Sequence, residues 1–418
     1  MGKTMIEKIM TAHSGEEAKA GSVIWLDLDV RSARDFGGAS VVHHLEKEYP
    51  DNPVIDKDRV AFTFDCNAPA VTIPYANNQH VCRTFARKHD IPLFDVNAGI
   101  GTHVLLERGI VGPGMTAVGT DSHFNILGAI GAFGQGMGDV DVAFAFRFGK
   151  TWFEVPSTMK INLKGVCEYP STAKDLALFI LGKIGAGGAL GKSIEFYGEQ
   201  IDAMGLVERL TLCSMATEMG AVCALATPNE EILEFCRSRS ETQEQFDPVV
   251  ADDDAEYSEF LELDISGLPP MMAAPSSPDN VYPVKELSGK KVDSVFVGSC
   301  TNGRYEDFAS VAEYLAGRNI ADGVMAKAVP ATREVYGDLL KNGIVKQFFD
   351  AGVIMSHAGC GGCASGQIGM TGKGEVQVST SNRNFKGKQG SGETFLASPL
   401  TAAACAVAGE ITSPEDMV

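Results

Sequence analysis

Two kinds of apolar spacing alternate along the first 150 residues of the chain. Apolar residues gather in short strand-like runs at residues 23–30, 60–64, 91–96 and 116–119. The segments between them carry the wider spacing of amphipathic helices, at residues 2–20, 39–49 and 72–89 and again up to about residue 150. Strands that alternate with helices are typical of parallel βαβ units. The pattern therefore predicts an α/β fold with mostly parallel sheets.

The same alternation continues in the rest of the chain, with interruptions. Strands are expected at residues 159–163, 295–297 and 376–378, and a helix at residues 174–181. We interpret the polar, acidic segment 230–262 as a surface excursion and the proline-rich segment 269–278 as a linker. These breaks predict three α/β domains around a central cleft, at residues 1–157, 158–283 and 284–418.

Several polar residues follow strand-like runs, namely Asp65, His103, Asp121, Ser122 and His123. In open α/β sheets, ligands bind outside the carboxyl ends of the strands, so we expect these side chains to line one crevice. Asp and His in contact form an oriented acid–base pair. The alternative for each histidine is an ordinary buried residue with a hydrogen-bond partner.

Composition and charge restrict the possible functions. A content of 44% apolar and 21% charged residues is that of a globular protein. The net charge of -19 argues against nucleic acid as a partner, because a phosphate-binding surface needs clustered Lys and Arg. No apolar run reaches the roughly 18 residues of a membrane span, and the polar start does not resemble a signal peptide. With ten mostly isolated cysteines, we expect a cytoplasmic protein with reduced thiols.

Three of the cysteines lie in two glycine-rich loops. Cys300 follows the apolar run 295–297, and Cys360 and Cys363 form a Cys-x-x-Cys. Structural zinc needs four closed ligands, and His357 is a candidate for the fourth, so a zinc site stays open as an interpretation. A cubane iron–sulfur cluster on three thiolates would leave one iron open to act as a Lewis acid.

A second group of polar residues lies in the loop 379–388. Asn382, Arg383 and Lys388 stand there among hydroxyl and amide side chains, and an arginine fork binds a carboxylate in bidentate fashion. This density of donors favours an anion site over a solvated loop. Glu195, in the segment 194–198, is a further candidate carboxylate, although alone it indicates little.

Seven stretches together resemble the aconitase superfamily, and within it the large subunits of the 3-isopropylmalate dehydratase and homoaconitase group. They occur in the family's order over essentially the whole chain. The stretches are residues 119–123, 128–138, 149–156, 194–198, 297–304, 359–363 and 381–390.

The resemblance implies one [4Fe–4S] cluster per subunit, held by Cys300, Cys360 and Cys363. It implies reversible loss of water from a 2-hydroxy di- or tricarboxylic acid. By motif position, the implied catalytic residues are Asp121, His123, His103, Asp65 and Glu195. The implied substrate-binding residues are Ser122, Arg383, Lys388 and Asn382, where Lys388 stands in place of a usual arginine.

The resemblance also indicates what differs in this chain. The swivelling domain of full-length aconitases is absent, which implies a separate small subunit that carries it. Cys66 replaces a usual histidine, Phe124 a usual threonine, and Ser214 a usual asparagine. We expect a less polar pocket and a substrate other than citrate. 3-Isopropylmalate is the default, with 2,3-dimethylmalate or the homoaconitase substrate as alternatives. A zinc-bound scaffold and an RNA-binding role are the competing functions.

Overall fold

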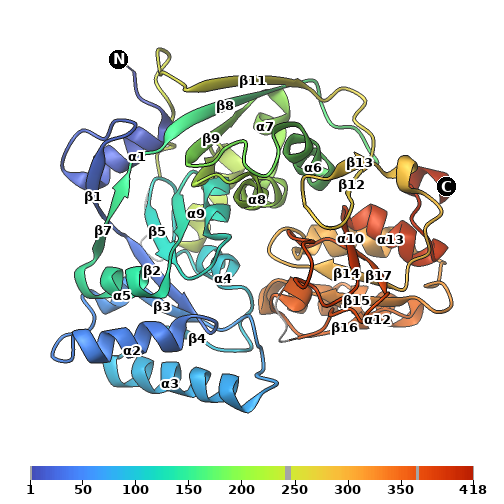
Figure 1. Cartoon of the computed structure of the whole chain (residues 1–418), viewed down its shortest axis with the longest axis horizontal. Coiled ribbons are helices and arrows are strands. Elements are labelled where there is room, and N and C mark those ends of the chain that lie inside the picture. The colour runs from blue at the N-terminus through green and yellow to red at the C-terminus, as the bar shows by residue number, and fades with distance from the viewer. Residues whose placement is uncertain (1, 241–245, 364–366, 418) are drawn as a thin grey trace.

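The computed structural model describes residues 2–240, 246–363 and 367–417. They form three main sheets that surround the centre of the molecule (Figure 1). The first has five parallel strands in the order β4-β3-β2-β5-β6. These are β2 (Val30–Arg34), β3 (Val60–Thr63), β4 (Leu93–Phe94), β5 (Thr116–Gly119) and β6 (Phe133–Gly136).

Three helices pack against the first sheet through a buried apolar cluster that joins them to β2 and β3. They are α2 (Gly38–Glu48), α3 (Ile73–His89) and α5 (Asp139–Phe148). A two-stranded antiparallel ribbon of β1 (Val23–Asp27) and β7 (Lys150–Glu154) lies beside α1 (Met5–Ser14).

The second sheet has four parallel strands in the order β10-β9-β8-β11. The strands are β8 (Ser157–Lys164), β9 (Lys192–Tyr197), β10 (Cys223–Leu225) and β11 (Glu259–Asp264). Its helices are α6 (Ala173–Ile184), α7 (Glu199–Ala203), α8 (Leu206–Met215) and α9 (Glu230–Arg239). Helix α8 packs on the 3-10 segment η2 (Phe124–Ile130), so one buried core joins the second sheet to the first.

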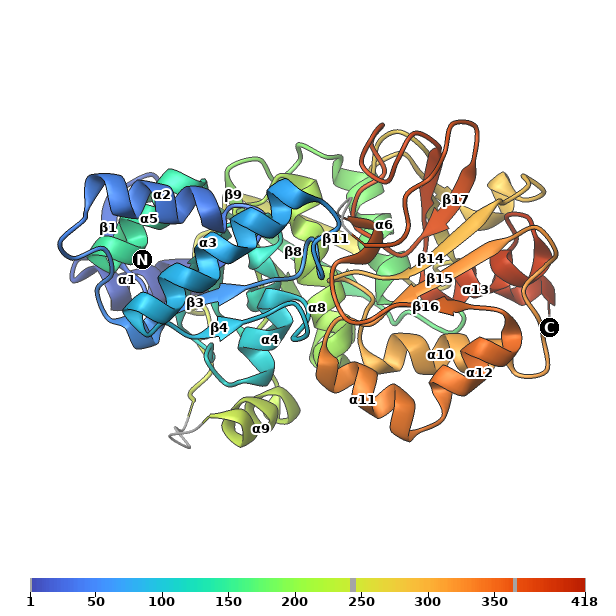
Figure 2. The ribbon, with the colours of Figure 1, turned by 90° about the horizontal axis from the view of Figure 1, so that it is seen from below.

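The third sheet has seven strands in the order β13-β12-β18-β17-β14-β15-β16. Its parallel strands are β14 (Ser294–Gly298), β15 (Met325–Val329), β16 (Ile354–Met355), β17 (Val376–Ser379) and β18 (Glu393–Leu396). Two antiparallel strands, β12 (Met271–Ala273) and β13 (Val281–Pro283), complete it. The helices are α10 (Tyr305–Leu315), α11 (Arg333–Lys341), α12 (Ile344–Ala351) and α13 (Pro399–Ala408). Figure 2 shows α10, α11 and α12 on the same side of β14–β16.

The α/β class with mostly parallel sheets is confirmed, while several local predictions were wrong. The helix expected at residues 2–20 ends at Ser14, because Gly15 adopts a left-handed conformation with φ 70°. The strand expected at residues 23–30 is two strands in different sheets. The expected surface excursion contains α9, which buries Ile232, and β11, which pairs with β8.

The expected linker 269–278 contains β12, which lies buried between β13 and β18. Its prolines flank the strand rather than interrupt it. Strands of the third sheet therefore begin before residue 283. The domain boundaries at residues 157 and 283 remain predictions.

The topology brings strand ends from two sheets to one place. Arg34 is the last residue of β2, Asp65 follows β3 and Asp121 follows β5. From the third sheet, Cys300 follows β14 and Arg383 follows β17. Because ligands bind beyond the carboxyl ends of parallel strands, this meeting point is where a site is expected.

Candidate active site

A cavity of about 460 Å³ opens where these strand ends meet. It is lined by all three predicted metal-ligating cysteines and by residues of the first and third sheets. The lining comprises Arg34, Phe36, Cys66, Asn67, Tyr75, Ile100, Thr120, Asp121, Ser122, His123, Cys300, Cys360, Cys363, Arg383, Phe385, Gly387 and Lys388. The cavity has the size of an ordinary small-molecule site.

Cys300 is presented by a tight turn directly after β14. Gly298 and Ser299 both have positive φ, 147° and 81°, and a positive φ in a residue other than glycine marks local strain. The Cys300 Sγ lies 3.5 Å from the Ser214 hydroxyl and 3.4 Å from the Asn382 Oδ1. Burial raises the pKa of this thiol well above its usual value. Its hydrogen-bond partners, Ser214 and Asn382, are both uncharged.

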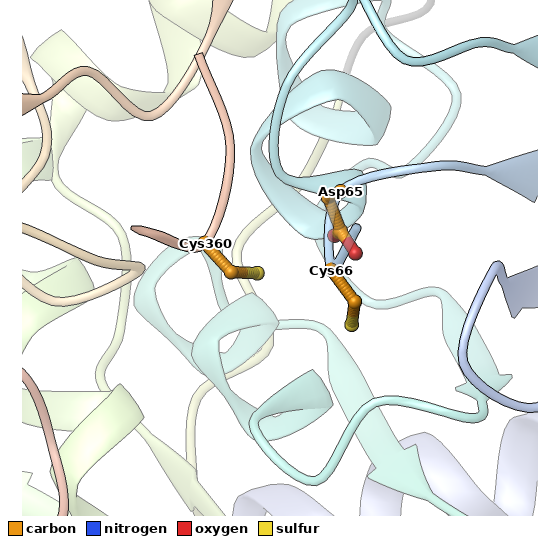
Figure 3. Close-up of side chains that lie close together, drawn as sticks. All are labelled: Asp65, Cys66 and Cys360. Carbon is orange, nitrogen blue, oxygen red and sulfur yellow. The ribbon is translucent and has the colours of Figure 1, made fainter. Parts of the chain in front are cut away.

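Cys360 meets different partners. The Arg34 Nη2 donates to its Sγ at 2.8 Å. Figure 3 shows the Cys360 side chain extending from its loop toward the end of β3, where Asp65 and Cys66 lie. The ligand atoms of these three residues lie within 4.8 Å of one another. The Cys360 backbone N–H also donates to the Asp65 carbonyl at 3.0 Å, which fixes the loop against the first sheet.

These residues fit an iron–sulfur cluster. All ten cysteines lie among the described residues and are free thiols, and four of them line one cavity: Cys66, Cys300, Cys360 and Cys363. Soft thiolate ligands select iron–sulfur clusters or zinc. His357, the proposed fourth zinc ligand, does not line the cavity, and its Nε2 lies against the Ala68 carbonyl oxygen. The zinc site predicted on Cys300, Cys360, Cys363 and His357 is therefore not formed, whereas the three cysteines lie where a cluster could bind.

Asp121 and His123 stand at the cavity as predicted, and a residue missed by the sequence analysis joins them. Glu218 accepts from the His123 Nε2 at 2.8 Å, and from the Arg383 Nε at 2.8 Å. Burial raises the pKa of Glu218, but its contacts with His123 and Arg383 outweigh this and lower the pKa overall. Glu218 therefore fixes both a candidate acid–base group and a candidate anion-binding group.

Arg34 is the second residue that the sequence analysis missed. Its Nη1 lies 2.8 Å from the Asp121 Oδ1, and its Nη2 lies 2.6 Å from the Asp65 Oδ1. Burial takes the pKa of Asp65 up to about 6 despite the opposing charge of Arg34. For Asp121, burial is outweighed by Arg34 and His123, and its pKa is lowered. The two carboxyl groups thus differ in acidity although they share one cation.

Three predicted site residues lie behind the cavity wall. Asp65 does not line the cavity but contacts Arg34, which does. Asn382 likewise contacts the cavity-lining Cys300. His103 is fully buried, and its Nε2 lies 2.8 Å from the Cys300 carbonyl oxygen, to which it must donate. Burial lowers the pKa of His103 to about 3, so this ring is neutral. In this position His103 supports the cysteine turn and does not face a ligand.

A buried lysine holds the loop that carries Asn382. The Lys174 Nζ donates to the backbone oxygens of Thr380 and Ser381, at 3.1 and 2.9 Å. Asn382 in turn donates from its Nδ2 to the Ser214 hydroxyl at 2.9 Å. Helix α6 of the second sheet therefore fixes the loop beside Cys300.

The mouth of the cavity combines cations and apolar rings. Ser122 is exposed there, and Lys388 is half-buried. Phe36 and Phe385 line the cavity while 74% and 46% exposed. Exposed rings beside a cavity provide apolar area for a ligand or for a covering partner.

Glu195 lies outside this cavity. Its carboxylate accepts from the Met5 backbone N–H at 2.7 Å and from the Tyr197 and Tyr257 hydroxyls at 2.7 and 3.0 Å. These contacts join the start of α1 to the second sheet. The geometry assigns Glu195 a structural role in place of the predicted catalytic one.

The three departures from the family pattern have different locations. Cys66 lines the cavity, and Ser214 contacts the Cys300 sulfur. Phe124 is buried and packs against Gly119 and Gly134 in the core, so the expectation that it makes the pocket less polar was wrong. Gly119, at the end of β5, has no Cβ and therefore leaves space for the Phe124 ring. No local sequence pattern indicates this contact.

Comparison with known proteins identifies the family. The aconitase family (aconitate hydratase) model matches residues 7–291 and 285–409. The 3-isopropylmalate dehydratase large subunit 1 of Methanopyrus kandleri is 43% identical over 99% of both chains. The homoaconitase large subunit of Thermus thermophilus is 38% identical and covers 100% of this chain and 98% of its own.

The chain therefore belongs to the aconitase family. It is a hydro-lyase, and the predicted reaction class is confirmed. Among solved structures, aconitase X of Thermococcus kodakaraensis matches with a TM-score of 0.51 at 14% identity, over 90% of this chain and 89% of its own. That likeness supports the fold alone. Among the described residues, no helix is long and apolar enough to span a bilayer.

Proposed function

We propose that this chain is the cluster-binding large subunit of a hydro-lyase that reversibly dehydrates an alkyl-substituted 2-hydroxy dicarboxylic acid, with 3-isopropylmalate as the default substrate. The observation that carries the proposal is that the three proposed cluster-binding thiols, an acid–base group and three cations line one cavity. 2,3-Dimethylmalate and the homoaconitase substrate are alternatives with the same mechanism.

Cys300, Cys360 and Cys363 would hold one [4Fe–4S] cluster per subunit. When bound, the cluster supplies a Lewis acid at the iron that carries no cysteine. Thiols must lose their protons to bind iron, so loading would release protons from the buried Cys300 and Cys360.

The chain's own residues bind and orient the substrate. Arg383 has its Nε bound to Glu218, which fixes the plane of its fork for a substrate carboxylate. Lys388 adds a second cation at the mouth. Loss of hydroxide needs a general acid, and His123, held by Glu218 through its Nε2, is the candidate for proton donation. Asp121 accepts the His123 backbone N–H at 3.1 Å and keeps the turn in place.

The apolar part of the lining supports an alkyl group on the substrate. Phe36, Tyr75, Ile100 and Phe385 line the cavity, and Cys66 stands where the family usually has histidine. A third carboxylate, as in citrate, would have to be desolvated against these groups, which costs free energy. An alkyl group would instead gain from burial.

The proposal includes a separate small subunit that covers the cavity. The relatives named above are both large subunits. Val71 and Ile73 are 63% and 80% exposed and stand between Asn67 and Tyr75, which line the cavity. They extend the exposed apolar area at its mouth. Reduced thiols are typical of the cytoplasm, where we propose that the enzyme acts.

The test is an activity panel. The chain is produced with its small subunit, its cluster is rebuilt anaerobically, and the hydration and dehydration of 3-isopropylmalate, 2,3-dimethylmalate, homocitrate and citrate are measured. We expect an alkyl-substituted malate to give the highest kcat/KM. A clear preference for citrate, or a chain that binds zinc and shows no iron–sulfur absorption, would contradict the proposal.

Cys66→His tests the basis of specificity. The variant restores the usual family residue and adds a polar ring to the cavity, so we expect it to lower kcat/KM for the alkyl-substituted substrate relative to citrate. Cys82→Ser is the control, since Cys82 lies on α3, is buried against α2 and does not line the cavity.

A further inference from the structure

Arg34 occupies the junction between the first and third sheets at the site. It comes from the end of β2, and its side chain is 13% exposed. Its guanidinium contacts the ends of two neighbouring strands and the Cys360 loop. The contacts are Nε to Asp65 Oδ1 at 2.9 Å, Nη2 to Asp65 Oδ1 at 2.6 Å, Nη1 to Asp121 Oδ1 at 2.8 Å and Nη2 to Cys360 Sγ at 2.8 Å.

This set of contacts needs an arginine. The planar guanidinium presents five N–H donors in a fixed fork, whereas a lysine ammonium is a point charge with three. Here the guanidinium contacts two carboxylates and one sulfur that lie in different directions from it. A lysine or glutamine at position 34 would leave at least one of these groups without its donor.

The charges around Arg34 explain why a cation is buried there. Asp65, Asp121 and a metal-bound Cys360 would place three negative groups together in a buried position, and buried charge is costly unless it is paired. An arginine side chain keeps its charge in proteins, and the carboxylates of Asp65 and Asp121 pair with it here at 2.6 and 2.8 Å. Arg34 is thus the shared counter-ion of the two acids and the thiolate.

Arg31 provides an internal comparison. It lies three residues earlier on the same strand and is 1% exposed. Its guanidinium donates to the backbone oxygens of Ile55 and Asp56. Arg31 therefore holds the chain together locally. The partners of Arg34 are instead side chains of the candidate site.

We propose that Arg34 is a positioning residue that donates a charge-assisted hydrogen bond to the Cys360 sulfur, and thereby sets the reduction potential and iron retention of the cluster, while it holds Asp65 and Asp121 in place. The inference rests on the proposed function, because it concerns the cluster that Cys360 would bind. Hydrogen bonds to cluster sulfurs and nearby charge are known controls of cluster potential. A positive charge beside the thiolate stabilises the more reduced, more negative state, so Arg34 raises the potential.

The experiment compares Arg34→Gln, Arg34→Lys and the control Arg31→Gln with the wild-type enzyme, each rebuilt with its cluster and small subunit. The readouts are the cluster reduction potential, the EPR spectrum after mild oxidation and the rate at which chelator removes iron. We expect Arg34→Gln to have a lower potential and to lose iron about 10- to 100-fold faster, the usual effect of removing a partner of a metal ligand. Arg34→Lys should be intermediate, and Arg31→Gln should match the wild type.

The outcomes separate this inference from the proposed function. A wild-type chain that binds no cluster overturns both. A wild-type cluster whose potential, EPR spectrum and iron retention are unchanged in Arg34→Gln overturns the role of Arg34 alone. If Arg34→Gln does not fold, Arg34→Lys decides, because it keeps the charge; wild-type potential and iron retention in that variant overturn the role of the fork.

Discussion

Cys300 and Cys360, one from each cysteine loop of this site, are buried beside different partners. Cys300 sits in a strained turn and contacts the neutral groups of Ser214 and Asn382. Cys360 lies in a loop fixed to the first sheet and contacts the cation of Arg34. Hydrogen bonds from an ionised donor are roughly twice as strong as neutral ones. The comparison indicates that the partners of Cys300 fix the position of its sulfur. The partner of Cys360 also balances the negative charge of its thiolate.

On the Cys300 side, the charges lie one step further from the sulfur. Glu218 pairs there with His123 and Arg383, and Lys174 contacts only backbone oxygens and the Met215 sulfur. Because Glu218 contacts the candidate acid–base and anion-binding groups rather than the thiol, changes at Glu218 should affect catalysis more than cluster chemistry. Four predictions test this division, beginning with the largest effect.

The largest effect is expected from the ligands themselves. Cys300→Ser and Cys360→Ser should each lose the cluster and reduce activity to background, because a hydroxyl is a poor ligand for iron compared with a thiolate. Cys66→Ser should keep the cluster, since Cys66 is not one of the three proposed ligands. Iron and sulfide per chain, with activity, are the measurements. A Cys66→Ser variant without a cluster would show that Cys66 is a ligand in addition to Cys360 and Cys363, and would contradict the proposed ligand set.

The second prediction concerns Glu218. Glu218→Gln keeps the shape but removes the charge that fixes His123 and Arg383, and we expect kcat/KM to fall by about 10²- to 10³-fold, within the range of general acid–base effects. The iron content and reduction potential should not change. Glu208→Gln, on the exposed start of the adjacent helix α8, is the matched control and should keep full activity. Loss of the cluster in Glu218→Gln would contradict the division between the two sides.

The sequence was sufficient to predict those cavity-lining residues that belong to local motifs. Asp121, His123, Arg383 and the three cysteines line the cavity as predicted, because each follows a strand and strand ends meet. Arg34 also ends a strand, which is the signal that could have found it, but its segment carries no motif. Glu218 lies on a short 3-10 turn with no periodic pattern, and only tertiary packing brings it to His123.

The wrong expectations have a common physical cause. Glu195 and His103 stand in motif-like segments, yet both are buried behind or outside the cavity, and the choice between contacting a ligand and contacting the backbone is made by neighbours far apart in sequence. The same holds for the expected excursion and linker. The segments around α9 and β12 are polar or proline-rich, although each element has a short apolar face that packs in the core. Composition averaged over a segment does not reveal such a face.

The third prediction concerns stability against acid. The folded pKa of Glu218 lies below its usual 4.5, so its pairing contributes stability above pH 4.5, and this contribution is lost as the pH falls through the lowered pKa. Glu218→Gln should therefore lower the free energy of unfolding at pH 7, by about 1–3 kcal/mol, and this deficit should narrow toward acid pH. Denaturant unfolding at pH 7 and at pH 4 measures it. An equal deficit at both pH values would mean that the charge of Glu218 contributes nothing to the fold.

The smallest effect, on the rate of iron release, is expected at Cys300, whose hydrogen-bond partners are neutral. Ser214→Ala removes the hydroxyl that lies between Asn382 and the Cys300 sulfur, and its loss should speed iron release by only about a few-fold, because a neutral hydrogen bond contributes about 1 kcal/mol. Chelator-driven iron loss from the rebuilt enzyme measures this rate. Ser193→Ala is the matched control, since this buried hydroxyl pairs with Thr158 in the second sheet and should leave the rate unchanged. If Ser214→Ala released iron as fast as Arg34→Gln, the two cysteine loops would not differ in kind. The slower rate expected here would place the main control of the cluster at Cys360, where a charge meets the thiolate.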